Sequence, residues 1–72
     1  MINETAFLIK IGSTIKKIRG EKKISQLSLA QLCQSDKASI SRIESGQANP
    51  TMHTLFKISE ALQVPIHTLF ED

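Results

Sequence analysis

The chain has 72 residues, enough for a single domain, and 40% of them are hydrophobic, which argues against a disordered chain. Its net charge of +2 is small, but the charges are unevenly distributed. Six basic residues and one acidic residue lie between Lys10 and Lys23, whereas four acidic residues and one basic residue follow Ile43. A polyanionic partner is therefore expected to meet the positive first third of the chain.

Cysteine content and hydropathy indicate the compartment. Cys33 is the only cysteine, so the chain cannot form an internal disulfide. The N-terminus does not resemble a signal sequence, and no apolar run is long enough to span a bilayer. These features predict a cytoplasmic protein with no membrane segment.

The first predicted helix runs from about Glu4 to Lys22. Five apolar side chains recur on one stripe at helical spacing, while the neighbouring lysines lie off the stripe. We therefore expect this helix to pack one face on the core and to expose its charges. The apolar residues are Phe7, Leu8, Ile11, Ile15 and Ile18.

The second predicted helix runs from about Gln26 to Cys33, with Ser25 as its N-cap. Ile24 and Leu29 stand at the positions of a hydrophobic staple, in which two apolar side chains fix the entry of the chain into a helix. The residues of this helix that are expected to face inward are Leu29, Ala30 and Cys33.

The stretch SDKASISRIESGQANP, residues 35–50, predicts a short third helix of about nine residues. Asp36 is a suitable N-cap, Gly46 can adopt the left-handed conformation that ends a helix, and Pro50 prevents continuation. Ile40 and Ile43 form a narrow apolar stripe at about 100° per residue. The opposite face carries small polar groups and one arginine, and comprises Ala38, Ser41, Arg42 and Ser45, with Lys37 at the start of the helix.

Two further helices complete the chain. The fourth begins after Pro50 with Thr51 as its cap, and the fifth is a short helix near residues 66–70 that follows Pro65. The expected inward side of the fourth helix comprises Met52, Leu55, Ile58, Ser59 and Leu62, with Phe56 flanking it.

Together these patterns predict an all-α fold, a compact domain of five helices without strands. Only Gln34, Ser35 and Asp36 separate the second and third helices, and a link this short forces the sharp turn of a helix-turn-helix. Ala30 is small enough to let these two helices cross closely. We expect residues 1–10 to be an N-terminal extension of helix one, residues 11–70 the helix-turn-helix domain, and residues 71–72 a tail.

Four strings of the sequence form a combination that is far more specific than any one of them. They are I-G-x-x-I-x-x-I-R from Ile11, S-Q-x-x-L-A from Ser25, S-I-S-R-I-E-S-G-x-x-N-P from Ser39 and L-F-K-I-x-x-A-L-x-V from Leu55. In this combination the chain resembles the Cro and lambda-repressor-like (XRE) family of helix-turn-helix regulators over residues 11–70. The resemblance implies a five-helix domain whose third helix enters the DNA major groove, and members of this family are the standard examples of that docking.

The resemblance also implies which side chains contact DNA. The fork of an arginine can bond two acceptors of guanine, and an alanine methyl can touch the methyl group of thymine. The implied base contacts are Lys37, Ala38, Ser41 and Arg42. The implied contacts to the DNA backbone are Gln26, Ser39, Ser45, Gln47 and Asn49.

Four further charged residues are expected to act as an ion pair or to lie on an exposed helix face. The resemblance pairs Arg19 with Glu44, and both residues flank their apolar stripes, so a structural ion pair is expected. Losing one partner would leave a partly buried charge unpaired, which is costly. Lys16 and Lys17 are expected either to attract the DNA backbone or to lie on a solvated helix face.

The sequence departs from the family pattern at several positions. Glycine is usual at the ends of helices one, two and four, where this chain has Lys23, Gln34 and Gln63. A non-glycine residue in the left-handed conformation costs about 1–2 kcal/mol, so either these helices end differently or the domain loses stability. Ser35 replaces a usual apolar residue, and the loop after Gly46 lacks the basic residues of many members.

The expected function is sequence-specific regulation of transcription, as a repressor, by a homodimer bound to a double-stranded DNA operator. One helix reads few base pairs, and dimers of this type meet half-sites about 34 Å apart. The expected dimer surface lies near Ile66, Leu69 and Phe70, together with Ile9. The alternative is that Ile66 and Phe70 simply cap the core.

A second class of function is an antitoxin or adaptor module of the same fold, whose partner is a protein such as a toxin. The two roles can coexist in one chain. No glycine-rich phosphate loop or nucleophile–base pair is present, and His53 and His67 lack partners at metal-ligand spacing. We therefore expect no enzyme activity, cofactor or metal. The absence of Trp and Tyr disfavours RNA binding.

Overall fold

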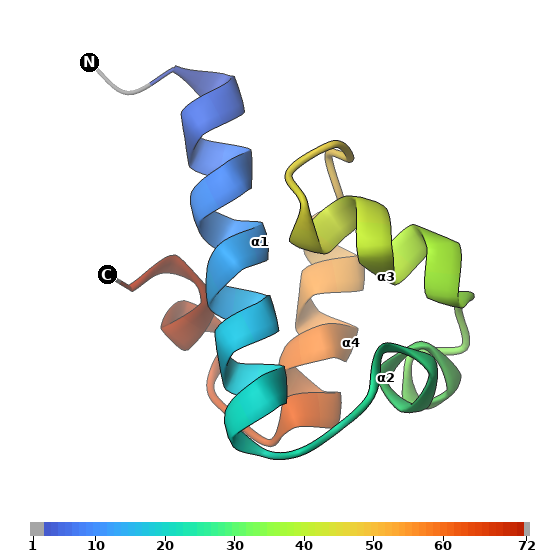
Figure 1. Cartoon of the computed structure of the whole chain (residues 1–72). Coiled ribbons are helices and arrows are strands. Elements are labelled where there is room, and N and C mark those ends of the chain that lie inside the picture. The colour runs from blue at the N-terminus through green and yellow to red at the C-terminus, as the bar shows by residue number, and fades with distance from the viewer. Residues whose placement is uncertain (1–2, 72) are drawn as a thin grey trace.

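The computed structural model describes residues 3–71, which form five helices and no strand (Figure 1). The predicted all-α fold is therefore confirmed. The elements in chain order are α1 (Glu4–Glu21), α2 (Gln26–Leu32), α3 (Lys37–Glu44), α4 (Met52–Leu62) and η1 (Ile66–Phe70). η1 is a 3-10 helix, and it packs on the opposite side of α1 from α3.

The predicted terminal regions fall partly outside the described residues. Residues 1–2 of the expected N-terminal extension and residue 72 of the expected tail are not described. Residues 4–10 form the first part of α1. None of the helices within residues 3–71 combines the length and the apolar composition that crossing a membrane requires.

Each α-helix begins at a side chain that accepts a hydrogen bond from the helix's own first turn. In all four cases a side-chain oxygen of the N-cap accepts from the backbone amide three residues later, at 2.7–3.2 Å. The predictions for Ser25, Asp36 and Thr51 are confirmed, and Asn3 is a further cap that the sequence patterns did not single out. Local chemistry therefore fixes where the helices start.

All four α-helices end in the same left-handed turn. The backbone amide that follows the turn donates to a carbonyl five residues earlier, at 2.8–3.0 Å, which is the hydrogen bond of a Schellman motif. In three of the four turns the left-handed residue is not a glycine, and each such residue costs about 1–2 kcal/mol. The residues with positive φ are Lys23 (59°), Gln34 (57°), Gly46 (79°) and Gln63 (60°).

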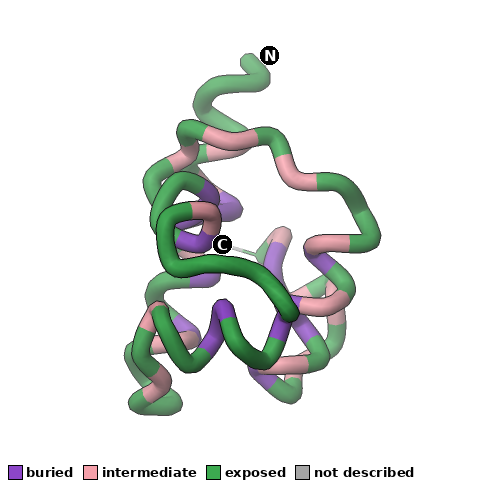
Figure 2. Tube along the Cα trace, turned by 90° about the vertical axis from the view of Figure 1, so that its right-hand side faces the viewer, coloured by how far each residue is buried: buried purple, intermediate pink, exposed green. Residues whose placement is uncertain are grey.

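One face of each helix contributes to a single core. Buried positions lie between exposed ones along each of the four α-helices, and η1 adds Leu69 (Figure 2). η1 closes the core because it packs on both α1 and α4. The buried apolar residues are Ile11, Ile15, Ile18, Leu29, Ala30, Cys33, Ile40, Ile43, Leu55, Ile58, Leu62 and Leu69.

Two apolar residues expected in the core lie largely at the surface. Met52 is 61% exposed and Phe7 is 41% exposed. Both lie near the N-terminal ends of their helices, where the apolar stripe extends past the elements that cover it. The ring of Phe7 instead stacks on that of Phe70, with centroids 6.4 Å apart.

The predicted dimer surface is wrong at Leu69. Its side chain is fully buried, because η1 presses this residue between α1 and α4. Ile66 and Phe70 are partly buried and pack against the same core, and part of each residue stays accessible. Ile9, by contrast, is 49% exposed.

Candidate nucleic-acid interface

α3 is held to the domain by a tightly packed inner face. Ile40 and Ile43 are 1% and 7% exposed. Gly12 of α1 lies directly beneath the end of α3, where an added Cβ would stand only 2.6 Å from the carbonyl oxygen of Glu44 and would overlap that of Ile43. The backbones of α1 and α3 therefore approach more closely than any side chain at this position allows.

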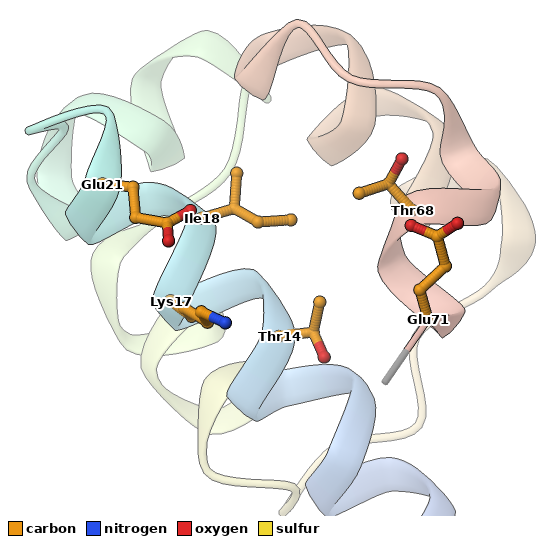
Figure 3. A pocket seen from close by; sticks show the side chains of 6 residues that line it. All are labelled: Thr14, Lys17, Ile18, Glu21, Thr68 and Glu71. Carbon is orange, nitrogen blue, oxygen red and sulfur yellow. The ribbon is translucent and has the colours of Figure 1, made fainter.

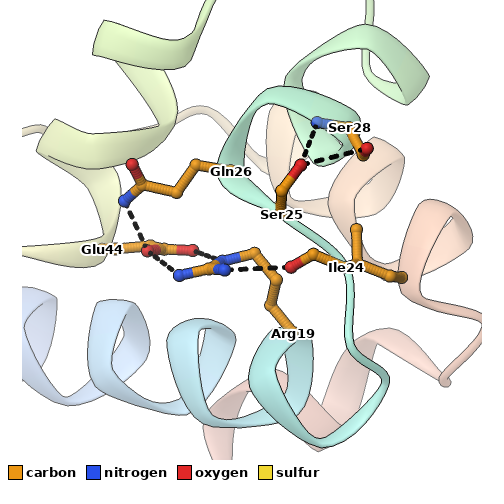
Figure 4. Close-up of polar contacts among 6 residues, drawn as sticks. All are labelled: Arg19, Ile24, Ser25, Gln26, Ser28 and Glu44. Carbon is orange, nitrogen blue, oxygen red and sulfur yellow. Dashed lines mark hydrogen bonds and ion pairs between the residues drawn. The ribbon is translucent and has the colours of Figure 1, made fainter.

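A buried ion pair fixes the end of α3. Arg19 donates to the Glu44 carboxylate through Nε at 2.6 Å and Nη2 at 3.1 Å, and through Nη1 to the backbone carbonyl of Ile24 at 2.9 Å (Figure 4). The side chains are 15% and 3% exposed. The hydrogen bond to Glu44 raises the pKa of Arg19, although burial opposes it. The structural pair expected from the sequence is present, and it joins α1, α3 and the link to α2.

Gln26, expected to contact a phosphate, belongs to the same polar cluster. Its Nε2 donates to Oε1 of Glu44 at 2.9 Å (Figure 4). A side-chain amide nitrogen carries two hydrogens, so this bond leaves one of them for another acceptor. Gln26 therefore ties the start of α2 to the end of α3, and the second hydrogen allows a contact outside the protein.

The outer face of α3 makes few contacts within the chain. Nη2 of Arg42 donates to the hydroxyl of Ser39 at 3.3 Å, one helical turn away. The Asp36 carboxylate caps the helix, and hydrogen bonds from Ser39 lower the pKa of Asp36, with a smaller contribution from the charge of Arg42. The four residues implied as base contacts are all exposed, namely Lys37, Ala38, Ser41 and Arg42.

The loop that follows α3 continues this exposed surface. The Ser45 hydroxyl donates to the carbonyl of Arg42 at 3.1 Å, and Gln47 is exposed. Nδ2 of Asn49 donates to Oε1 of Glu4, at the start of α1, at 3.3 Å. The expected backbone contacts Ser45, Gln47 and Asn49 therefore lie together at one end of α3. The contact with Glu4 joins residues far apart in the sequence, and no local pattern predicts it.

The structure separates Lys16 from Lys17, although both are exposed. Lys16 follows Gly12 by one helical turn, so it lies on the side of α1 that meets α3. Lys17 lies on the other flank, where it lines a cavity of about 200 Å³ between α1 and η1 (Figure 3). The surface around α3 therefore includes Lys16 but not Lys17. The other residues that line the cavity are Thr14, Ile18, Glu21, Thr68 and Glu71.

An apolar groove of about 440 Å³ opens beside the same loop. Sequence patterns assign Phe7 and Met52 to the core, so they do not reveal it. Large exposed apolar patches are typical of surfaces that a partner covers. The groove is lined by Phe7, Leu8, Ile11, Asn49, Pro50, Met52, Leu55 and Phe70.

Across residues 3–71, no group of three or more His, Cys, Asp or Glu side chains is arranged to hold a metal ion.

A short helix exposed on one side, joined by a tight turn to the helix that supports it, is the arrangement of a helix-turn-helix DNA-binding domain. The model of a protein family described as Helix-turn-helix (HTH_3) matches residues 15–69. The chain therefore belongs to the helix-turn-helix family of DNA-binding transcription regulators.

Individual relatives agree with this assignment. The chain is 38% identical over 65 residues to the control protein C.MunI of Mycoplasma sp, covering 89% of this chain and 88% of that protein. It is 40% identical over 63 residues to the transcriptional regulator SinR of Bacillus subtilis (strain 168), covering 86% of this chain but only 57% of SinR. The crystal structure of the restriction-modification controller protein C.AhdI of Aeromonas hydrophila superposes with a TM-score of 0.86 at 32% identity, covering 88% of this chain and 96% of that one.

Proposed function

We propose that the chain recognises a specific double-stranded operator by inserting the outer face of α3 into the major groove. Arg42 and Lys37 bond acceptors on base edges, while Ala38 and Ser41 allow close approach. The observation that carries the proposal is the two-sided character of α3. Its apolar side is locked into the core, and its small, cationic side has almost no partner within the chain.

The DNA backbone is bound by the rim of the same surface. Amide and hydroxyl groups dominate this rim and cations are few, so we expect affinity to fall less steeply with salt than in proteins that neutralise many phosphates. Lys17 is left out because it faces η1. The proposed backbone contacts are Gln26, Ser39, Ser45, Gln47, Asn49 and Lys16.

We further propose that two copies of the chain meet through the apolar groove. A two-fold dimer presents two recognition helices to successive major grooves, which extends the sequence that is read. Phe7, Met52 and Phe70 replace the buried Leu69 as the central residues of this surface. Ile9 is exposed but does not line the groove, since it lies against Gly46 at the end of α3.

Sedimentation of the wild type and of Met52→Glu tests the dimer. We expect the wild type to dimerise, and Met52→Glu to remain monomeric with an unchanged helical circular dichroism spectrum. His53→Glu, at the neighbouring exposed position, is the matched control. A wild type that stays monomeric at all accessible concentrations would refute this part of the proposal.

Selection of bound duplexes from random DNA, at a stated salt concentration, tests recognition itself. We expect a palindromic consensus whose half-sites are about one helical turn apart. Enrichment of no consensus would contradict sequence-specific recognition, whereas a consensus without symmetry would contradict only the dimer.

A narrower proposal concerns the regulated genes. The chain covers most of the control protein C.MunI and most of the restriction-modification controller protein C.AhdI. We propose a controller of that kind, which predicts that the selected operator lies upstream of genes for a DNA methyltransferase and an endonuclease. Operators found only beside unrelated genes would refute this assignment and leave DNA recognition intact.

A further inference from the structure

A hydrogen bond joins the start of α1 to the loop that follows α3. Nδ2 of Asn49 donates to Oε1 of Glu4 at 3.3 Å, and both residues are exposed. Glu4 stands directly after the N-cap Asn3, so its backbone position is set by the start of a long helix. The contact therefore places a carboxylate beside one of the proposed contacts to the DNA backbone.

The carboxylate of Glu4 lies in different surroundings from the carboxylate of Glu44. Glu44 accepts from the guanidinium of Arg19, which balances its charge, and from the amide of Gln26. Asn49 is neutral, so its bond to Glu4 leaves the negative charge uncompensated by that contact. A negative charge at the edge of a DNA-binding surface repels the phosphates that approach it.

We infer that Glu4 restrains DNA binding, because its carboxylate holds the Asn49 amide and its negative charge repels the backbone phosphate that this amide binds. The inference rests on the proposed role of Asn49. When DNA binds, the Asn49 amide gives one of its two hydrogens to a phosphate oxygen, and the carboxylate of Glu4 stays near the DNA backbone. Because phosphates occur in every sequence, Glu4 weakens binding to the operator and to random duplex alike.

Two substitutions separate the hydrogen bond from the charge. Glu4→Gln keeps an oxygen that accepts from Asn49 but removes the charge, whereas Glu4→Ala removes both. Glu21→Gln is the matched control, because Glu21 is an exposed residue about 25 Å away at the other end of α1. That distance exceeds the screening length at ordinary salt, so its charge acts only weakly on the loop.

Fluorescence anisotropy with the selected operator and with a random duplex measures the effect. At about 50 mM salt we expect Glu4→Gln to tighten binding about threefold and Glu4→Ala about fivefold, with smaller gains at about 200 mM salt. In an Asn49→Ala background, the two Glu4 variants should bind equally. Glu4→Ala also removes an acidic group from the first turn of α1, which lowers helix stability, so its tighter binding does not come from better folding.

Three outcomes would overturn the inference: unchanged affinity in both Glu4 variants, an equal gain in Glu21→Gln, or a gain on the operator alone. Arg42→Ala in the same titrations reports separately on α3. Unchanged binding by the Glu4 variants beside a loss of operator preference in Arg42→Ala refutes the role of Glu4 and leaves the proposed function standing.

Discussion

The two faces of α3 differ in burial and in hydrogen bonding. On the inner face, Ile40 and Ile43 are buried and Glu44 is bonded to both Arg19 and Gln26. Within residues 3–71, no buried side-chain nitrogen or oxygen lacks a hydrogen-bond partner. On the outer face, the side chains are exposed and make weak contacts at most.

This difference separates stability from recognition within one short helix. A helix of eight residues is not stable alone in water, so the inner face must supply its stability through packing. The outer face is then free to carry residues that suit DNA and contribute little to folding. Substitutions on the two faces should therefore have separable effects on stability and on DNA binding.

The largest effect is expected from breaking the buried ion pair. Arg19→Met leaves the Glu44 carboxylate buried without its cation, and we expect a loss of about 3–5 kcal/mol in the free energy of unfolding. The double variant Arg19→Met/Glu44→Leu should recover most of that loss, because no charge remains to be desolvated. Urea denaturation measures both. A loss below about 1 kcal/mol in the single variant would contradict an essential pair on the inner face.

The next effect concerns the close crossing of α1 and α3. Gly12→Ala forces a methyl group into the carbonyls at the end of α3, and we expect a loss of about 3 kcal/mol. Gly20→Ala, in the same helix, meets no atom within 4 Å and should gain about 0.5–1 kcal/mol from helix propensity. Thermal unfolding of the two variants should therefore shift in opposite directions.

On the outer face, Arg42→Ala should leave the unfolding free energy unchanged within about 0.5 kcal/mol. It should weaken binding to the selected operator by about 1–3 kcal/mol and binding to random duplex by much less. Arg42→Lys keeps the charge but not the fork, so it should resemble Arg42→Ala on the operator. Equal losses on both duplexes would count against a base contact.

A smaller effect is expected at the ends of the helices. Gln34→Gly, in the turn between α2 and α3, relieves a left-handed non-glycine residue and should stabilise the domain by about 1 kcal/mol. Gly46→Ala should destabilise it, because the new Cβ would stand 2.6 Å from Cγ1 of Ile9 in an already left-handed turn. Denaturant titration would contradict this account if the two shifts had the same sign.

The smallest effect is the pH dependence that Asp36 contributes. Hydrogen bonds from Ser39 lower its pKa in the folded state below the ordinary 3.8, so its carboxylate stabilises the fold above that value. The contribution is lost as pH falls through the lowered pKa. Asp36→Asn keeps a capping oxygen but does not titrate, so the stability difference between wild type and Asp36→Asn should shrink on acidification. A constant difference would exclude this role.

Sequence patterns located the elements of the fold because their causes are local. The predicted caps Ser25, Asp36 and Thr51 act within one turn, and the apolar stripe of α3 follows from helical spacing alone. The resemblance to helix-turn-helix regulators identified the pairing of Arg19 with Glu44, which no local rule contains. In contrast, the Glu4–Asn49 contact and the apolar groove depend on how distant segments meet.

What the sequence alone determined is where each helix starts and which face of α3 turns inward, because capping and spacing operate over a few neighbouring residues. Tertiary packing decided that Leu69 is buried, that Lys17 faces η1, and that Met52 is exposed. It also imposes the left-handed turns at Lys23 and Gln63, whose residue types do not favour them. The physical reason is that burial and strain depend on which elements lie opposite, and that arrangement exists only once the whole domain is packed.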